Sequence, residues 1–409
     1  MLIAAVCSSA LADEEAARNE ALLSGRLPEI FRKAAEHYKA LDAAATPLAI
    51  SETEEGKPAD SGKAAVPHSY DPKKKKLDMC SIYWWTTGHY PGSLWYLYEA
   101  TGDEFFKERA KFWTGLLAPN SKVTSNHDVG FIVNCSFGNA RRILKTEEYD
   151  GLMVETARSL CERYNPALGL IRSWGGKSDR KKFLVIPDNL MNLELLEVAS
   201  KLPGGETRFD EIARSHATVT MRNHFRCDGG VYHVLNYDQS EGRVGTVQEI
   251  RRGQGLSCET AWSRGQSWAI YGYTMMYRET GDRAYLDFAK KVSDYATDNP
   301  NMPGDGVPYW DYGAKGEERD SSAAAIMASG LMELSGFVGG AKGQAYRAFA
   351  VKQLLSLSSQ EYFSEGDEIG HWLLKHGTGN KPGNGEIDVP LDYGDYYFLE
   401  ALLRFQRMR

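Results

Sequence analysis

Two kinds of helical segment alternate along the whole chain, and this alternation limits what the chain can fold into. In residues 283–299, Tyr285, Phe288, Val292 and Tyr295 fall on one stripe with charged residues opposite, as in an outer helix that is half exposed to solvent. Such amphipathic segments lie near 22–42, 103–118, 150–164, 206–225, 283–299 and 343–359. Between them lie segments that are apolar almost all round, near 82–100, 130–145, 188–201, 264–280, 321–336 and 394–407. Helices of this second kind must be enclosed by the rest of the fold.

An internal repeat indicates how consecutive segments are joined. Residues 94–110 and 273–289 each contain the end of an apolar segment, the link Thr-Gly-Asp and the start of an amphipathic segment. The glycine of each link suits the left-handed end of one helix, and the aspartate suits the N-cap of the next. These pairs are Gly102-Asp103 and Gly281-Asp282. The pattern predicts a ring of helical hairpins.

Six such hairpins that close on themselves form an (α/α)6 barrel, an all-α fold, which we expect as a single domain over residues 21–409. The inner helices then run in one direction, so their N-termini, with unpaired N–H groups and positive dipole ends, meet at one end. The loops that enter these helices are long and rich in glycine and aromatic residues, which favours a functional role. They span 60–81, 119–130, 165–187, 227–263, 298–320 and 360–393. Residues 50–76 are the exception and are predicted to be a mobile, solvated arm.

The N-terminus and the charge balance limit the location and the partners of the protein. Residues 1–20 are expected to be a truncated signal peptide and leader, because a short apolar stretch ends in Ala10-Leu11-Ala12 before acidic sequence. This predicts a periplasmic or secreted protein, with a cytoplasmic location as the alternative because the usual basic start is missing. The net charge is −7 and no basic stripe is present, so nucleic acid is not an expected partner. Beyond the N-terminus, no stretch approaches the ~18 uninterrupted apolar residues of a membrane span.

Two aspartates stand at the starts of neighbouring inner helices. Asp128 and Asp188 are therefore expected to face one another across the open end of the barrel. For each of them alone, an ordinary N-cap is the favoured explanation. A functional pair is favoured because His127, Gln254 and Arg264 occur at equivalent helix starts.

Tryptophans gather in the same loops and helix starts. They are Trp84, Trp85, Trp174, Trp262, Trp268 and Trp310. Together they indicate a surface against which a sugar ring can stack. Tryptophan is also a common core residue, and some of the six are expected to be just that.

The motifs at these positions together resemble the unsaturated glucuronyl hydrolases, glycoside hydrolase family 88. They are NHDVGF (126–131), IPDNLMNL (186–193), GGVYHVLNYD (229–238), RGQG (252–255), ETAWSRGQSWAIYGY (259–273) and DYGDYYFLEALLR (392–404). Their order and spacing hold over roughly residues 25–409. The resemblance implies the (α/α)6 barrel again. It also implies an enzyme that removes the 4,5-unsaturated uronic acid left by polysaccharide lyases at the non-reducing end of oligosaccharides, glycosaminoglycan fragments being the expected source.

The resemblance further implies roles for individual residues. Asp188 corresponds to the general acid and base, and Asp128 to the second essential carboxylate. The positions that correspond to sugar-binding residues are His127, His233, Gln254, Trp262, Arg264 and Trp268. Trp85 and Trp174 resemble ring-stacking aromatics, with Trp84 as the alternative to Trp85. In the last helix Tyr396 is expected to contact the sugar, with Tyr393 as the alternative.

Two cationic positions have open alternatives. Arg264 is a candidate for binding the uronate carboxylate, or it forms a packing ion pair with Glu259 or Asp188. Lys381 is a candidate for receiving a sulfate on the adjoining sugar, or it belongs to a solvated loop in which the lysine is incidental.

The implied chemistry is the hydration of a vinyl ether, in which protonated Asp188 delivers a proton to C4 and water adds at C5. Asp188 must then hold its proton near neutral pH, well above its ordinary pKa of about 3.9. We expect an apolar enclosure and the charge of Asp128 to raise this pKa. The nearby Asp128 is expected to outweigh the helix dipole, which favours the anion by only about 0.3–1 kcal/mol. No metal or cofactor is expected, since the nine histidines lack ligand spacing.

Three other functions compete with this one. The closest is that of the unsaturated rhamnogalacturonyl hydrolases, which share the barrel and the hydration chemistry but act on pectin fragments. An epimerase-like barrel would use histidines such as His216, His224 or His233 as acid and base. A sugar-binding protein without activity would not need both Asp128 and Asp188, and the two aspartates therefore favour an enzyme.

Overall fold

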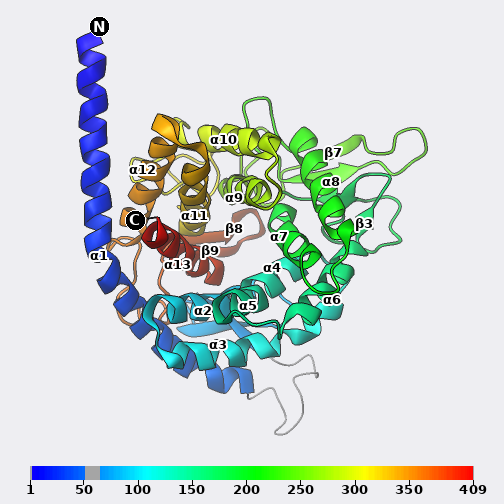
Figure 1. Ribbon diagram of the computed structural model, residues 1–409, viewed down its shortest axis with the longest axis horizontal. Helices are drawn as coiled ribbons and strands as arrows, with labels where there is room; N and C mark the ends of the chain where they lie inside the picture. The colour runs from blue at the N-terminus through cyan, green and yellow to red at the C-terminus, as the bar shows by residue number, and fades with distance from the viewer. Residues whose placement is uncertain (1, 51–64, 409) are drawn as a thin grey trace.

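The fold is a ring of helical hairpins, seen from one end in a computed structural model (Figure 1). The structure describes residues 2–50 and 65–408, with side chains for 13–49 and 65–408. The inner ring consists of α2 (His89–Thr101), α4 (Val129–Val133) with α5 (Asn139–Leu144), α7 (Asn189–Ser200), α9 (Ser263–Thr280), α11 (Ser321–Val338) and α13 (Asp392–Arg407). The outer ring consists of α1 (Leu2–Ile50), α3 (Glu104–Leu116), α6 (Asp150–Cys161), α8 (Thr207–Asn223), α10 (Arg283–Thr297) and α12 (Gly340–Leu357). The predicted (α/α)6 barrel and its alternation of helices are confirmed.

The helix links have the predicted geometry. Gly102 and Gly281 both take the left-handed conformation with φ 68°, and each N–H bonds back to the preceding helix. The Asp103 carboxylate accepts a hydrogen bond from the N–H of Phe105 at 3.0 Å, and Asp282 does the same two residues further on in its own helix. These two hairpins therefore reverse direction by the same local chemistry.

The segment that enters α2 differs from its prediction. Helix α2 begins at His89, so residues 82–88 of the predicted helix form turns instead. The predicted mobile arm is half replaced by a hairpin, since β1 (Ala65–Asp71) pairs with β2 (Lys76–Ser81). Val66 is fully buried, so the hairpin belongs to the core. Residues 51–64 lie outside the described part of the chain.

Short strands also stiffen the other loops at the end where the inner helices begin. Strands β5, β6 and β7 form one antiparallel sheet, and β8 pairs with β9. Their bounds are β3 (Tyr164–Asn165), β4 (Leu170–Ile171), β5 (Leu184–Val185), β6 (Val234–Tyr237), β7 (Val247–Arg251), β8 (Gly377–Asn380) and β9 (Gly385–Val389). The loops that lead into the inner helices therefore contain regular, hydrogen-bonded secondary structure.

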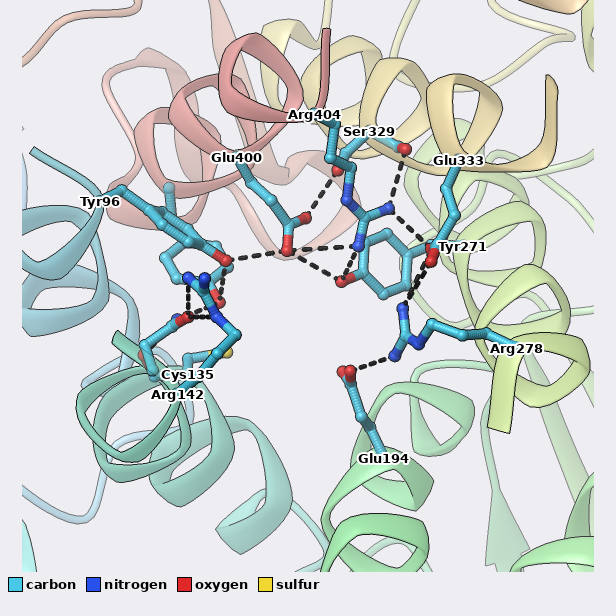
Figure 2. Close-up of polar contacts among 12 residues, drawn as sticks. Tyr96, Cys135, Arg142, Glu194, Tyr271, Arg278, Ser329, Glu333, Glu400 and Arg404 are labelled. Atoms are coloured by element: carbon cyan, nitrogen blue, oxygen red, sulfur yellow. Dashed lines mark hydrogen bonds and ion pairs between the residues drawn. The ribbon is translucent and has the colours of Figure 1, made fainter. Parts of the chain in front are cut away.

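The opposite end of the barrel is held by a network of buried charges (Figure 2). Arg278 of α9 and Arg404 of α13 both bond Glu333 of α11 at 2.9 Å, and Arg278 also bonds Glu194 of α7. The Glu400 carboxylate accepts hydrogen bonds from tyrosines of α2 and α9. We call Glu194, Arg278, Glu333, Glu400 and Arg404 the base network; it lines a cavity of about 630 Å³. The arginines stand in last turns, where cations offset the negative ends of helix dipoles.

Helices α11 and α1 contain the segments that concern the predictions of a membrane span and of a leader. Helix α11 is long and apolar enough to cross a membrane by length and composition, but most of it is buried in the inner ring. The predicted leader, residues 1–20, falls in the first part of α1, which projects beyond the ring (Figure 1). The side chains of residues 1–12 lie outside the described part, and from Leu23 onward α1 contributes buried residues to the core. The predicted export remains a prediction.

Candidate active site

Asp128 and Asp188 stand immediately before α4 and α7, and neither side chain caps its helix. These helices touch closely, since the Phe131 N–H donates to Asn192 Oδ1 at 2.7 Å. A Cβ atom on Gly130 would lie 2.6 Å from the Asn192 Cα, so only glycine permits this approach. The simple capping explanation is therefore wrong for both aspartates. The close packing brings the starts of the two helices together.

Both carboxyl groups are set up to keep a proton near neutral pH. Burial raises the pKa of Asp188 to about 7, against the opposing effects of the Arg264 charge and its own backbone amide. Burial likewise raises the pKa of Asp128 to about 7, against the charge of Arg163. Among the described residues, none forms a hydrogen bond with the buried Oδ1 atom of Asp188.

The cause of the Asp188 shift differs from the prediction. Burial dominates, and the charge of Asp128 raises the pKa of Asp188 by less than the backbone at the helix start lowers it. The predicted order of these two smaller effects is therefore wrong, although the raised pKa is as expected. The side chain of Asp188 is only 11% exposed, which explains why desolvation leads.

Two buried histidines stand beside the carboxyl groups. His127 places its Nε2 3.2 Å from Asp128 Oδ1, and burial lowers the pKa of His127 to about 3. The Nδ1 of His233 accepts the backbone N–H of Gln254 at 2.7 Å, which leaves the proton on Nε2. That Nε2 lies 4.0 Å from Asp188 Oδ1, and burial lowers the pKa of His233 to about 3. Both rings are neutral and able to donate a hydrogen bond.

Arg264 lies behind the site and is almost fully buried. Its guanidinium bonds Asp320 at 3.2 Å and the carbonyls of Thr378 and Gly379 at 2.6 Å each. Neither predicted ion pair, with Glu259 or with Asp188, is formed. Arg264 instead ties strand β8 to α9 and α11, and its charge lowers the pKa of Asp188 from a distance.

Aromatic side chains form the wall of the site. Trp262 stacks on His233 with ring centres 4.2 Å apart, and the Arg264 guanidinium lies 4.4 Å from the Trp262 ring. Trp85 is half-buried, with its ring centre 5.0 Å from that of Tyr393. Trp268 is fully buried. Among the described residues its indole N–H forms no hydrogen bond, but its position beside Asp188 slightly lowers the pKa of that carboxyl group.

Two exposed tryptophans stand further out. Trp84 is 46% exposed and Trp174 is 39% exposed. Trp85, not Trp84, therefore belongs to the aromatic wall. Trp174 follows Ser173, whose carbonyl accepts the His127 N–H at 3.0 Å, so Trp174 lies at the rim beside the first carboxylate.

Several named enzymes are similar to this chain in sequence and in fold. An unsaturated glucuronyl hydrolase of Formosa agariphila is 42% identical over 328 residues, covering 79% of this chain and 80% of the relative. An unsaturated chondroitin disaccharide hydrolase of Streptococcus pyogenes serotype M1 is 32% identical over 333 residues, covering 79% and 81%. The crystal structure of an unsaturated glucuronyl hydrolase specific for heparin has a TM-score of 0.82 at 37% identity, covering 93% of this chain and 97% of that one. No protein-family model matches the chain.

The chain belongs to the unsaturated glucuronyl hydrolases. It is accordingly a glycosidase that removes a 4,5-unsaturated uronic acid. This result supports the main functional prediction over the rhamnogalacturonyl, epimerase-like and binding-only alternatives.

One tyrosine lies away from the site in this member of the unsaturated glucuronyl hydrolases. The hydroxyl of Tyr396 accepts hydrogen bonds from Tyr96 and Asn139 and borders the cavity at the opposite end. Its predicted contact with the sugar is not compatible with this position. Tyr393, one helical turn earlier in α13, lies beside Trp85 and 5.2 Å from the Arg264 guanidinium, and its hydroxyl is buried without a partner.

Lys381 is already neutralised by acidic neighbours. Its ammonium lies 2.7 Å from Glu317 and also contacts Glu318. A sulfate would have to compete with these two carboxylates. The structure therefore favours a structural role over the predicted sulfate contact.

A charged cluster near the aromatic wall was missed from the sequence. His68 Nε2 lies 2.5 Å from Glu386, and His68 Nδ1 lies 3.0 Å from Thr86 and 3.7 Å from Asp392. Burial lowers the pKa of His68, but the hydrogen bonds and charges of Asp392 and Glu386 raise it to about 10. The cluster fastens β1 to β9. No local pattern marks it, because 318 positions separate His68 from Glu386.

Proposed function

We propose that Asp188 and Asp128 are the catalytic pair of this enzyme and that it acts by hydrating the C4=C5 double bond. The observation that supports this most strongly is the unpartnered, buried Asp188 oxygen, together with the raised pKa of Asp188. A general acid that later serves as a base works best when its pKa is near the working pH. Asp188 meets this requirement.

The reaction proceeds from a protonated Asp188. Its proton is transferred to C4, and the positive charge that develops at C5 is shared with the ring oxygen. Water adds at C5 while the Asp188 carboxylate accepts one of its protons, so the carboxyl group is restored. The hemiketal formed at C5 opens and the glycosidic link then falls apart. Because C1 is not attacked directly, the spacing of the carboxylates does not predict retention or inversion.

The surrounding residues support these steps without taking a proton themselves. The neutral His233 directs its Nε2 proton toward Asp188, and His127 can donate to Asp128. Asp128 is 20% exposed at its side chain and stands where it can orient the incoming water. Trp85, which is half-buried beside Tyr393, offers an apolar face on which a sugar ring can stack.

The substrate we propose is an oligosaccharide derived from a glycosaminoglycan. The structural neighbour described as specific for heparin and the relatives named for chondroitin disaccharides support this class. A further structure at 28% identity holds the unsaturated saccharide dGlcA-Glc-Rha-Glc, so the terminal unsaturated uronate is the shared feature. We also propose export to the periplasm or medium, supported by the N-terminal pattern alone; cleavage of residues 1–12 in the mature protein would test it.

Absorbance of the conjugated alkene tests the function directly. Lyase-made oligosaccharides from glycosaminoglycans are expected to lose this absorbance with the wild-type enzyme, and those from pectin to keep it. Asp188→Asn is expected to abolish nearly all turnover while retaining substrate binding. Asp103→Asn is the matched control, because Asp103 caps a helix of the outer ring. Activity retained by Asp188→Asn would refute the proposed role.

A further inference from the structure

A group of basic side chains is exposed on the two loop segments that lead to Asp188 and away from His233. Arg180, Lys181 and Lys182 are exposed on the loop that leads into β5, and Arg243 is exposed between β6 and β7. We call these four residues the cationic rim. They stand out because the whole chain has a net charge of −7. Arg180, Lys181 and Arg243 line a recess of about 560 Å³ in which Asp238 is the one carboxylate among the lining residues.

The cationic rim is connected to both catalytic carboxylates through short segments. Its loop begins after Ser173, which bonds the backbone of His127, and ends at Asp188. The β6–β7 hairpin is flanked by His233 and Gln254, which bond one another. Figure 1 shows this hairpin projecting beyond the outer helix α8. The cationic rim therefore lies on the two segments that lead to Asp188 and His233.

The loop that carries these cations is firmly held. Arg172, only 4% exposed, donates to the carbonyls of Lys182 at 2.5 Å and Asp179 at 3.0 Å, and stacks on Phe183. The Asp179 carboxylate accepts the N–H groups of Lys181 and Lys182 at 2.8 and 3.1 Å. The buried guanidinium of Arg172 therefore fixes the backbone of the loop that carries Lys181 and Lys182. Like charges gathered in this way cost stability unless an anion offsets them.

Only part of this charge is neutralised inside the described chain. Arg243 pairs with Asp238 at 3.0 Å. The pKa of Glu249 is lowered mainly by its hydrogen bond with Arg251 and to a smaller extent by the charge of Lys182. For Arg180 and Lys181, the described residues provide no ion pair. The recess therefore has an excess of positive charge directed toward solvent.

We propose that the cationic rim binds the anionic groups of sugars beyond the cleaved linkage, so that the enzyme prefers unsaturated oligosaccharides of four or more units. This inference rests on the proposed function. The exposed face of Trp174 lies on the same loop and offers a stacking surface for an intervening ring. Sulfates and uronate carboxylates share the required chemistry. A positive surface also raises the rate at which anionic chains arrive.

The test compares a tetrasaccharide with a disaccharide from the same polysaccharide. The triple variant Arg180→Gln, Lys181→Gln, Lys182→Gln is measured beside Arg26→Gln, Arg283→Gln, Lys291→Gln, which changes the net charge equally on exposed outer helices. The ratio of the two kcat/KM values, tetrasaccharide over disaccharide, is expected to fall about tenfold in the rim variant, mainly through KM. It should also fall with added salt in the wild type. The control variant is expected to keep the wild-type ratio.

Each outcome has a defined meaning. A ratio unchanged in the rim variant, or lowered equally in the control, would overturn the proposal. Disaccharide turnover by the wild type tests the underlying activity separately, so the two failures are distinguishable. A larger fall with a sulfated than with an unsulfated tetrasaccharide identifies sulfate as the bound group, and an equal fall identifies the carboxylate. The single variant Lys181→Glu repeats the test with a minimal change.

Discussion

At the scale of single residues, the enzyme keeps carboxyl groups in places that are costly for the folded state. Asp188 is buried and Asp128 is half-buried, and neither caps its helix, whereas Asp103 and Asp282 are ordinary caps at the ends of the repeated links. The sequence alone treats all four alike, as aspartates before a helix. What separates them is enclosure by loops that are distant in the sequence.

This enclosure predicts a pH-dependent gain of stability in Asp188→Asn. The unfolded carboxyl has a pKa of 3.8 and the folded one about 7, so between these values the folded state binds more protons. Stability therefore falls as the pH rises through this window, and the buried charge costs most above pH 7. Asparagine removes that cost. Its stabilisation is expected to be about 1–3 kcal/mol larger at pH 8 than at pH 5.

Urea unfolding of both proteins at the two pH values measures this difference. Asp103→Asn serves as the control, since its exposed cap should change stability equally at both. A stabilisation by Asp188→Asn that does not vary with pH would contradict the raised pKa.

The site residues were predictable to the extent that they stand in motifs at helix starts. The choice between Tyr393 and Tyr396 was not predictable, because both lie in one motif. Only their positions along α13 place Tyr393 in the aromatic wall and Tyr396 near the base network. The His68 cluster was also missed, since it joins a β-hairpin to a strand near the other end of the chain. Arg264 was placed near the site, but its partners came from β8 and α11.

At the scale of elements, the meeting of α4 and α7 depends on the absence of a side chain at Gly130. A Cβ there would meet the Asn192 backbone at 2.6 Å, so Gly130→Ala forces the helices apart. We expect a destabilisation of about 1–3 kcal/mol, as for other overpacked sites. Turnover should fall by about 100-fold, because displacement of a catalytic group by about 1 Å has this effect.

Gly115→Ala in α3 is the matched control. Nothing lies within 4 Å of its added Cβ, so it should keep full activity and gain up to about 1 kcal/mol. Activity and stability are compared by alkene absorbance and urea unfolding. Full activity in Gly130→Ala would show that the two helix starts need not lie so close.

The helices were predictable because their apolar residues recur with the helical period. The strands were not, because β1 to β9 are short and sit in loops whose charges hide them. The turn between β1 and β2 is one proline followed by three lysines, which made a buried hairpin resemble a solvated arm. Residues 82–88 share the apolar and aromatic character of the inner helices. They form turns, in which the Thr87 hydroxyl donates to the carbonyls of Ile82 and Trp84.

At the scale of the whole molecule, the ring carries the two aspartates at one end and is held together by charges at the other. Arg278 of the base network contacts Glu194 and Glu333, and also Glu279 outside the network; these side chains are 20%, 15% and 16% exposed. Arg278→Met leaves these carboxylates without their shared cation. The expected loss is about 2–4 kcal/mol, less than for a fully buried pair because the network is partly exposed.

The turnover of each folded Arg278→Met molecule should remain near that of the wild type, since the base network lies at the end of the barrel away from Asp188. Arg158→Met is the control: Arg158 is 49% exposed in its pair with Glu206 and should cost less than about 1 kcal/mol. Equal losses in the two variants would mean that the base network does not hold the ring together.

The closed ring was predictable from the number and alternation of the hairpins. The end at which the inner helices begin was predictable from their common direction. The base network was not predictable from the sequence, because its residues come from four different helices and no motif links them (Figure 2).

The central claim, that Asp188 holds its proton until the alkene arrives, is tested most directly by infrared difference spectroscopy. The carboxyl C=O band of the wild type minus that of Asp188→Asn isolates this one group during a pH titration. The account predicts that the band disappears with a midpoint near pH 7. A midpoint near the ordinary value of about 4 would contradict it.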